Sequence, residues 1–374
     1  MDMGLFLPNL SNGWLITTEA PPFESNFENC LKLIQSAEQW GLEFALAPVK
    51  LRGFGGPSEF WDHAPEPITL MAGVAAATKS IRLFASVATL TMPPAIAARM
   101  AATLDQISNG RFGLNIVSGW QPAEYSQMGV WPGDSYFADR YDYCAEYVTI
   151  LRDLWNDGRS DFDGRWFHMK DCHLSPRPKH HINVVCAGQS EKGLAFCSKF
   201  GDYMFSQGVG INTPTAHAVT TSRLLDEGKR TGRTIGAYLA MMVIAEETDE
   251  AAFAKWRRYN ETTDRVALAN LSGEAGADQA ASASSTAKSL VKGEVDTAGL
   301  TPLPEGAVNM HFGTLVGSYA SVARMLDEAS TVPGTAGVMM IFDDWMRSID
   351  NFGRHVQPLM RSRSANAQVS HSQC

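Results

Sequence analysis

Apolar residues follow two different patterns along most of this chain. Short, mostly apolar runs predict buried strands, and segments with apolar residues at three- and four-residue spacing predict helices between them. The expected strands cover residues 3–7, 44–47, 81–90, 111–117, 183–187, 203–206, 238–245 and 337–342. The expected helices cover residues 26–40, 67–79, 93–107, 139–155, 215–231 and 349–360, with others after residues 190, 245 and 318. This alternation predicts an α/β fold, a single (β/α)8 barrel.

Three segments depart from the alternation. Residues 268–312 are rich in Ala, Ser and Gly and weakly periodic, which is typical of a mobile insertion or lid. Residues 365–374 are small and polar, so we expect a disordered tail. A small hairpin is expected at residues 160–166, with its Asp-Gly pair at the turn. We therefore expect one barrel domain over residues 1–364 that carries the 268–312 insertion before its last strand.

Composition and charge exclude several classes of function. The chain has 374 residues, a formal net charge of −9 and no run of basic residues, which argues against nucleic-acid binding. No apolar window is long enough to cross a bilayer, and no signal peptide is recognisable at the start. The six cysteines are scattered without a CxxC pair, as is typical of reduced thiols in a cytoplasmic protein.

Common catalytic motifs do not account for the chain either. It contains no Walker or GxGxxG fingerprint and no GxSxG elbow. Glu59, Asp62 and His63 lie close together in the sequence, but the other histidines show no ligand spacing. We therefore expect no metal site.

The segment of residues 105–141 combines a predicted strand with a loop rich in Gly, Pro and Trp. In (β/α)8 barrels, active sites lie at the carboxyl ends of the strands, where such loops begin. Asn115 interrupts this apolar strand, and Ser86 interrupts the strand at residues 81–90 in the same way. A buried amide must find hydrogen-bond partners. Asn115 is therefore a candidate for ligand contact, although a structural amide that bonds local backbone would produce the same pattern.

A second group of candidates could bind an anion. Gly188, Gln189 and Ser190 stand where a predicted strand enters a helix, and backbone N–H groups at a helix start bind phosphate. Arg140 offers a positive charge and Tyr141 a hydroxyl. A plain helix N-cap for Ser190 and a surface ion pair with the preceding aspartate for Arg140 remain open as structural explanations.

Three more candidates lie in predicted loops. Lys50 follows the second strand at its carboxyl end, and Glu124 and Trp120 follow the fourth strand. The carboxylate of Glu124 could accept a hydrogen bond from a ligand N–H, and Trp120 could stack on a planar ring. Solvated side chains for Lys50 and Glu124, and core packing for Trp120, are the structural alternatives.

Several motifs together resemble those of known enzymes. The turn DQISNGR at residues 105–111 and the segment GTLVGS at 313–318 are similar to the bacterial-luciferase-like, two-component flavin monooxygenases. A more specific resemblance is to the pyrimidine monooxygenases (RutA-type) within that superfamily. It rests on LRGFGG (51–56), EFWDH (59–63), TMPP (91–94), GW (119–120), WPGD (131–134), RYDY (140–143), CAGQS (186–190) and NTPT (212–215), and it covers nearly all of residues 3–360.

The resemblance implies FMN across the carboxyl ends of the strands. The matching flavin contacts are Val49, Lys50, Asn115, Glu124, Arg140, Tyr141 and Ser190, with Gly188 and Gln189 in the same phosphate cradle. It also implies that Lys50 stabilises negative charge on the reduced ring, and that Asn115 and Ser86 form a pocket for dioxygen. Ser86 stands where members of the family tend to carry Thr, which removes a methyl group from that pocket. Lys50, Trp120 and Glu124 are the expected substrate contacts.

The implied reaction is an FMN-dependent pyrimidine oxygenation. Reduced FMN would come from a separate NADH-dependent flavin reductase and react with O2. The resulting flavin-N5-peroxide would open the uracil ring between N3 and C4 and give a ureidoacrylate or peroxyureidoacrylate in pyrimidine degradation. Uracil or thymine would be the substrate of a cytoplasmic homo-oligomer with no nucleic-acid or membrane partner.

Three other functions remain open at this stage. The chain could be another luciferase-like monooxygenase that acts on a sulfone, a chelator or a chlorinated aromatic compound with reduced FMN. It could be a deazaflavin-dependent oxidoreductase on the same barrel. It could also be a non-catalytic flavin-binding protein.

Overall fold

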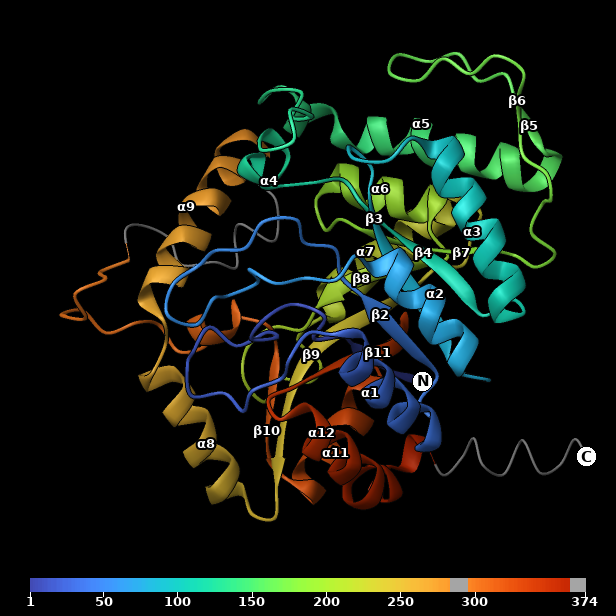
Figure 1. Ribbon diagram of the computed structural model, residues 1–374. Coiled ribbons are helices and arrows are strands. Elements are labelled where there is room, and N and C mark those ends of the chain that lie inside the picture. Colours follow the sequence, from blue (N-terminus) through green and yellow to red (C-terminus); the bar gives the residue numbers. More distant parts are fainter. Residues whose placement is uncertain (283–294, 364–374) are drawn as a thin grey trace, which may run out of the picture.

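The computed structural model describes residues 1–282 and 295–363 of the chain. They form a closed barrel of eight parallel strands in the order β9-β11-β1-β2-β3-β4-β7-β8, and β8 pairs with β9 again (Figure 1). The barrel strands are β1 (Asp2–Phe6), β2 (Phe44–Ala47), β3 (Arg82–Ala88), β4 (Phe112–Val117), β7 (Asn183–Ala187), β8 (Tyr203–Gln207), β9 (Gly236–Glu246) and β11 (Thr335–Phe342). The predicted (β/α)8 barrel is confirmed.

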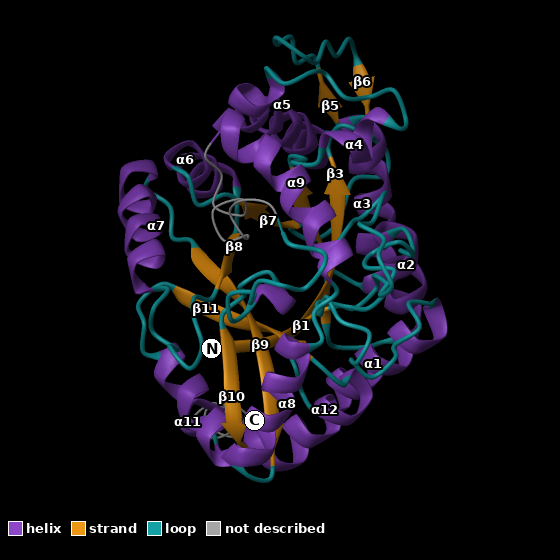
Figure 2. Cartoon of the chain, turned by 90° about the vertical axis from the view of Figure 1, so that its left-hand side faces the viewer, coloured by secondary structure: helices purple, strands orange, loops and turns teal. Residues whose placement is uncertain are grey.

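Helices surround the barrel and connect its strands (Figure 2). They are α1 (Phe27–Gln39), α2 (Pro67–Ala77), α3 (Pro94–Ser108), α4 (Pro122–Ser126), α5 (Tyr136–Asp157), α6 (Glu191–Phe200), α7 (Ala218–Thr231), α8 (Asp249–Glu261), α9 (Arg265–Ser282), α11 (Tyr319–Ser330) and α12 (Trp345–Asn351). Several begin at a side-chain cap, such as Asn26, which accepts a hydrogen bond from the Asn29 N–H over 2.9 Å. Caps of this kind satisfy N–H groups that a helix start leaves unpaired, so the local sequence sets these boundaries.

Glycines make room for aromatic rings inside the barrel. A Cβ on Gly4 of β1 would lie 2.6 Å from the ring of Phe44 on β2. Gly113 on β4 makes the same room for Phe84 on β3. The ring of Phe44 stacks on that of Tyr238, with centroids 4.1 Å apart. These rings pack the barrel toward its amino end and leave space for a ligand toward the carboxyl ends of the strands.

A polar cluster closes the amino end of the barrel. The Arg82 guanidinium donates hydrogen bonds to the Asp2 carboxylate and, over 3.0 Å, to the Tyr203 hydroxyl. The Tyr238 hydroxyl donates to the same carboxylate over 3.1 Å. Burial raises the pKa of Tyr238, so its phenol remains a neutral donor. The Arg82 guanidinium, the Asp2 carboxylate and the two tyrosine hydroxyls are therefore all hydrogen-bonded, as buried polar groups usually are.

The turn at residues 105–111 binds neighbouring segments of the protein. Asp105 is buried and accepts a hydrogen bond from the Lys179 N–H over 2.7 Å, which fixes the segment leading into β7. Arg111 donates over 2.9 Å to the Ala75 carbonyl, near the end of α2. Both contacts satisfy groups that would otherwise be unpaired. This turn therefore holds neighbouring segments of the barrel together.

The hairpin between α5 and β7 is longer than predicted. Its strands are β5 (Arg159–Ser160) and β6 (Cys172–His173), which pair antiparallel, and its tip is closed by a hydrogen bond from the Gly164 N–H to the Phe167 carbonyl. Glu146 of α5 accepts three backbone hydrogen bonds from this tip, over 2.8, 3.0 and 3.3 Å. Asp163 and Gly164 therefore do not form a two-residue turn. The contacts of the tip with α5 determine where the chain reverses its direction.

One strand of the sheet, β10 (Thr314–Ser318), was not predicted from the sequence. It pairs in parallel with the carboxyl half of β9, from Met242 to Glu246, whereas β8 pairs with the amino half. The long β9 therefore extends beyond the point where β8 ends, and β10 lies along that extension. The run TLVGS is short, and its partner strand is distant in the sequence, so no local pattern indicated the pairing.

The expected 268–312 insertion is only partly described. Helix α9 occupies its first part, where Leu268 and Leu271 are buried, and a 3-10 turn covers Ala307–Asn309. Residues 283–294 and the expected tail at 365–374 lie outside the described residues, so the mobile insertion and the disordered tail stay predictions. No helix in the described ranges is long and apolar enough to span a membrane.

Candidate active site

A cavity lies at the carboxyl ends of the strands, beyond the rings that pack the barrel. Its volume is about 180 Å³, and it combines aromatic walls with a few buried polar groups, as small-molecule sites do. The aromatic walls include Phe6, Trp14, Trp61, Trp120, Phe205 and Phe312. The predicted site residues that line it are Val49, Lys50, Ser86, Asn115, Trp120 and Glu124. Six candidates chosen from separate segments thus meet in one cavity.

Asn115 and Ser86 lie side by side because their strands pair in register. Nδ2 of Asn115 donates a hydrogen bond to Oγ of Ser86 over 2.8 Å, and both residues are buried. Oδ1 of Asn115 has no hydrogen-bond partner within residues 1–282 and 295–363. An unsatisfied buried acceptor costs about 1–3 kcal/mol. A ligand that donates a hydrogen bond to this oxygen would remove that cost.

Lys50 is buried in the cavity wall, with a side chain only 3% exposed, so it is not a solvated loop lysine. Its Nζ lies 3.4 Å from Oε2 of Glu124 and donates a hydrogen bond to Oε1 of Gln121. The other oxygen of Glu124 accepts from the Leu51 N–H over 2.6 Å. Burial lowers the pKa of Lys50, and the nearby Glu124 opposes that effect. The cavity therefore contains a buried ion pair.

Aromatic rings surround the ammonium group of Lys50. Its Nζ lies 4.8 Å from the ring centroid of Phe54, 4.9 Å from that of Trp120 and 5.6 Å from that of Trp61. Ring faces attract a cation at these distances. Phe54 and Trp61 belong to the LRGFGG and EFWDH segments. The segments that carry the more specific resemblance thus form the wall around this cation.

Helix α9 holds that wall in place. Asp264, at the start of α9, accepts hydrogen bonds from the Ser58 N–H and hydroxyl over 2.8 and 2.7 Å. Asn270 donates over 2.8 Å to the carbonyl of Phe54, and Leu271 reaches the cavity itself. Figure 1 places α9 along the side of the barrel next to α4. The first part of the 268–312 segment is therefore part of the site.

An anion cradle follows directly after Ala187, which lines the cavity. A Cβ on Gly188 would lie 2.7 Å from the Cα of Gly193 and 2.8 Å from Oη of Tyr141, so only glycine permits this approach. Ser190 caps α6 by accepting the Gly193 N–H over 3.2 Å. The hydroxyls of Tyr141 and Ser190 thus meet at a helix start, where a phosphate is stabilised. The N-cap explanation for Ser190 is correct and is compatible with this role.

Arg140 is buried beside this cradle, with 4% of its surface exposed. Its guanidinium lies 5.2 Å from the ring centroid of Tyr141. The carboxylate of Asp139 pairs with Arg165 over 2.8 Å. Because Arg140 is buried, it is not a surface residue, and it supplies a buried positive charge near the cradle.

A hollow of about 450 Å³ adjoins the cavity and shares Gln207 and Phe312 with it. Gln189 lines this hollow, which brings the last of the predicted cofactor contacts to the same side of the barrel. His311 also faces it, and burial lowers the pKa of this imidazole. The hollow and the cavity thus lie side by side at the carboxyl ends of the strands, with Gln207 and Phe312 between them.

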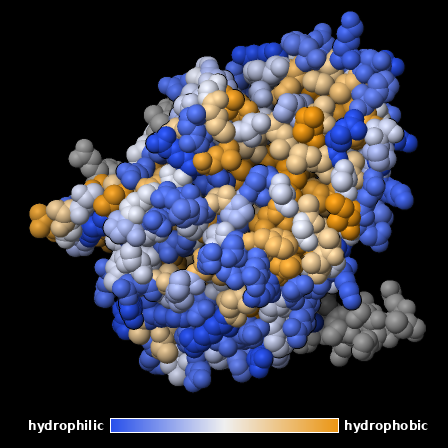
Figure 3. All heavy atoms as spheres, in the orientation of Figure 1, coloured by the Kyte–Doolittle hydropathy of each residue, from blue (hydrophilic) through white to orange (hydrophobic). Residues whose placement is uncertain are grey.

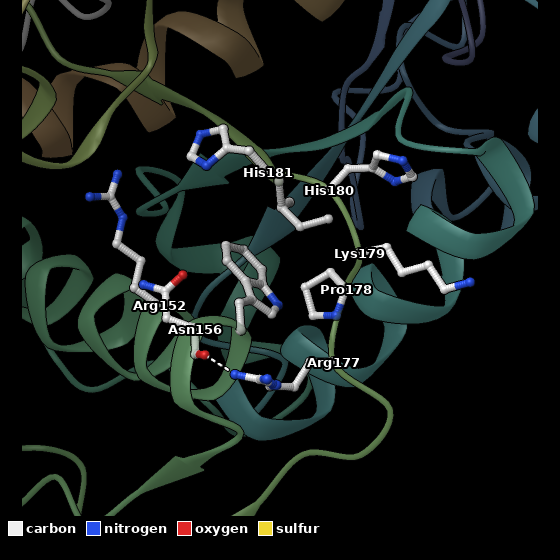
Figure 4. Close-up of a pocket in the computed structure, with 9 residues that line it drawn as sticks. Arg152, Asn156, Arg177, Pro178, Lys179, His180 and His181 are labelled. Carbon is white, nitrogen blue, oxygen red and sulfur yellow. Dashed lines mark hydrogen bonds between the residues drawn. The ribbon is translucent and has the colours of Figure 1, made fainter.

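A larger hollow lies elsewhere, between α5 and the segment leading into the amino end of β7 (Figure 4). It measures about 640 Å³, and its basic lining residues are Arg152, Arg177, Lys179, His180 and His181. Protein groups already engage these side chains: Arg177 donates to the Asn156 carbonyl, and His181 lies 3.1 Å from Asp202. It lies at the end of the barrel away from the candidate residues. Its larger size therefore does not make it the active site.

Sequence reasoning missed several residues of the cavity. Gln121, which binds Lys50 of the cavity wall, was also overlooked; its position between the candidates Trp120 and Glu124 was the only signal in the sequence. Gln207 ends β8 and lines the cavity, but a polar residue at a strand end is common. Among the described residues, no cluster of three or more His, Cys, Asp or Glu could hold a metal ion.

The fold places the cavity at the carboxyl ends of the strands, where (β/α)8 enzymes have their active sites. The chain belongs to the luciferase-like monooxygenase family, whose sequence model matches residues 1–334. It is therefore a flavin-dependent monooxygenase by family.

Relatives with known names are similar over nearly the full chain. Pyrimidine monooxygenase RutA of Bradyrhizobium sp. (strain BTAi1) is 55% identical over 365 residues, which cover 98% of each chain. Pyrimidine monooxygenase RutA of Serratia proteamaculans (strain 568) is 53% identical over 364 residues, which cover 97% of this chain and 96% of the relative. The resemblance stated from the motifs is confirmed.

Solved structures share the fold at low sequence identity. Riboflavin lyase RcaE, with modified FMN and the substrate riboflavin, has a TM-score of 0.80 at 19% identity and covers 97% of this chain and 92% of its own. Long-chain alkane monooxygenase LadA has a TM-score of 0.78 at 17% identity, with coverages of 97% and 92%. These likenesses support the barrel fold.

Proposed function

We propose that this chain is an FMN-dependent pyrimidine monooxygenase that opens uracil or thymine between N3 and C4. The observation that carries the proposal is the meeting of Lys50, Asn115 and Glu124 in one cavity beside the Gly188 cradle. The name of the relatives, pyrimidine monooxygenase, supports the substrate class.

The residues present fit FMN. The hydroxyls of Tyr141 and Ser190 and the charge of Arg140 would hold its phosphate at the start of α6. The orphaned Oδ1 of Asn115 would accept a hydrogen bond from the reduced ring, and Lys50 would stabilise negative charge on it. When bound in reduced form, the flavin supplies the electrons that activate O2.

The same cavity offers complementary groups to a pyrimidine. The carboxylate of Glu124 can accept a hydrogen bond from a ring N–H, and the ammonium of Lys50 can donate to a ring carbonyl. Trp120 presents an aromatic face to a planar ligand. Ser86 and Asn115, which are joined by a hydrogen bond and line the cavity, would lie beside the dioxygen.

Water exclusion is the remaining task of the protein. The cavity walls include Trp14, Trp61 and Phe312. The ring of Trp14 makes edge-on contacts with the other two, with centroid distances of 5.2 Å to Trp61 and 5.6 Å to Phe312. A dry site directs activated oxygen toward the substrate and limits its loss as hydrogen peroxide. The 268–312 segment, whose helix α9 holds this wall, would act as the lid.

The partners follow from the same proposal. We expect reduced FMN from a separate NADH-dependent flavin reductase and a cytoplasmic location. We also expect a homo-oligomer. In support, Figure 3 shows apolar side chains gathered over the region of α2 and α3. Ile96 and Ile107 of α3 are 50% and 42% exposed there, and an exposed apolar patch favours association.

The decisive experiment is a reaction with uracil, FMN, NADH, a flavin reductase and 18O2, followed by mass spectrometry. We expect a ureidoacrylate or peroxyureidoacrylate that carries 18O at the former C4 atom. Omission of the reductase or of FMN should abolish the product. Unchanged uracil under conditions in which reduced FMN is consumed would overturn the proposed substrate.

A further inference from the structure

Gln121 occupies an unusual position for a glutamine, because its side chain is buried behind Lys50, a residue of the cavity wall, and faces a cation. The residue is only 1% exposed, and its Oε1 accepts a hydrogen bond from Nζ of Lys50. Pro122 follows it as the first residue of α4 and restricts Gln121 to an extended backbone, with φ −107° and ψ 102°. The backbone therefore fixes where this amide oxygen lies.

One short turn provides most of the surroundings of Lys50. Trp120 contributes a ring face, Gln121 an amide oxygen and Glu124 a carboxylate. The charged groups that act on Lys50 are Glu124 on α4 and Glu274 on α9. The carboxylate of Glu124 also accepts the Leu51 N–H over 2.6 Å, so it is shared between two donors. Phe54 and Trp61 close the other sides with uncharged rings.

These contacts give the ammonium group one carboxylate partner, Glu124, and one uncharged acceptor, Gln121. A carboxylate in the place of Gln121 would hold the proton on Lys50 firmly, whereas an amide accepts the hydrogen bond without adding a negative charge. Burial lowers the pKa of Lys50, in agreement with this geometry. The amide thus fixes the position of the nitrogen without placing a second negative charge beside it.

We propose that Gln121 is a positioning residue that holds the ammonium group of Lys50 in place at the cavity wall. This inference rests on the proposed function only for the identity of the substrate that Lys50 would face. The assignment of Gln121 itself concerns contacts within the chain.

The test is an NMR titration of the full chain with 13C at the lysine ε-carbons, without cofactor or substrate. The Lys50→Met variant identifies the Lys50 resonance. In Gln121→Glu, the pKa of Lys50 should rise by about 1–3 units because a carboxylate then faces the ammonium. In Gln121→Met it should fall below that of the wild type, because the acceptor of the charged form is lost.

A matched control is available on the same turn. Gln127 donates over 2.8 Å to the carbonyl of Leu51 but does not contact Lys50. Gln127→Met should leave the Lys50 titration unchanged. Circular dichroism identifies any variant that fails to fold, and Gln121→Glu, which keeps the shape of the side chain, then carries the test alone. A Lys50 titration that is the same in Gln121→Glu as in Gln127→Met would overturn the proposal.

Turnover gives a second readout. With uracil as substrate, the pH profile of kcat for Gln121→Glu should move toward higher pH by the shift measured in the titration, with little change in FMN affinity. A KM increase at an unchanged pH profile would contradict the role of Gln121. If the wild type fails to convert uracil while the titration shifts as expected, the proposed substrate fails and the positioning role stands.

Discussion

Asn115 donates a hydrogen bond from Nδ2 to Oγ of Ser86 over 2.8 Å, and this bond joins the polar interruptions of two adjacent strands. The register of β3 and β4 brings them together at the base of the cavity. Because Oδ1 of Asn115 has no partner in the described part of the chain, the pair is complete only when a ligand donates to it.

The first prediction concerns this pair. Asn115→Ala should reduce turnover of uracil by at least tenfold, with a smaller loss of FMN affinity, because the phosphate cradle is left intact. Ser86→Ala should destabilise the fold by about 1–3 kcal/mol, since the Asn115 amide loses its acceptor. Ser86→Thr retains the hydroxyl and serves as the control. Steady-state kinetics, FMN titration and urea unfolding measure these effects; equal losses of turnover and FMN affinity in Asn115→Ala would indicate a structural role.

The second prediction concerns the buried pair of Lys50 and Glu124. Lys50→Met should destabilise the protein by about 3–5 kcal/mol, because it leaves the Glu124 carboxylate buried without its cation. The double variant Lys50→Met/Glu124→Gln should recover most of that loss. Unfolding in urea measures all three proteins, and a double variant as unstable as the sum of the single changes would argue against coupling.

The same pair gives a pH dependence whose sign is determined by the lowered pKa of Lys50. Below its folded-state pKa, Lys50 is charged in both states, and the folded protein bears the full cost of desolvation. Between that pKa and 10.5 the unfolded chain binds a proton that the folded chain has lost, so stability from this group rises with pH. The Lys50→Met/Glu124→Gln variant should lose this rise relative to wild type, as measured by unfolding at several pH values above 7.

The third prediction concerns the anion cradle. In Gly188→Ala the new Cβ would come within 2.8 Å of Oη of Tyr141, so the cradle must open. We expect FMN affinity to fall at least tenfold, about 1.4 kcal/mol, by fluorescence titration. Gly276→Ala on α9 meets no atom within 4 Å and should leave FMN affinity unchanged, with stability higher by up to about 1 kcal/mol. Unaltered binding in Gly188→Ala would remove the cradle from the site.

The fourth prediction concerns the thiols. The five cysteines in the described ranges are free, in agreement with the expected reduced state. Burial raises the pKa of Cys30 and of Cys144 to about 12, so at pH 8 neither forms much thiolate. Cys172 is only half-buried and should react first. Alkylation at pH 8 followed by peptide mass spectrometry tests the order, which rapid labelling of Cys144 in the folded protein would contradict.

Much of the fold could be predicted because its signals are local. Apolar runs such as residues 44–47 and helix caps such as Asn26 depend on neighbouring residues alone, and the structure has them where the pattern indicated. The hairpin tip and β10 were not predictable in this way. Their positions depend on Glu146 and on the extension of β9, which are distant in the sequence.

The sequence by itself determined the barrel, the end of the strands at which the site lies, and the polar residues that interrupt the apolar strands, among them Asn115 and Ser86. The pattern implied that both residues are buried, because a strand with apolar residues on both sides is covered on both faces. Only the tertiary structure decided that Gln121 holds Lys50, that Phe54 and Trp61 surround the cation, and that α9 supports this wall. These contacts join loops from different parts of the chain, and the barrel brings their ends together only after all of its strands have paired.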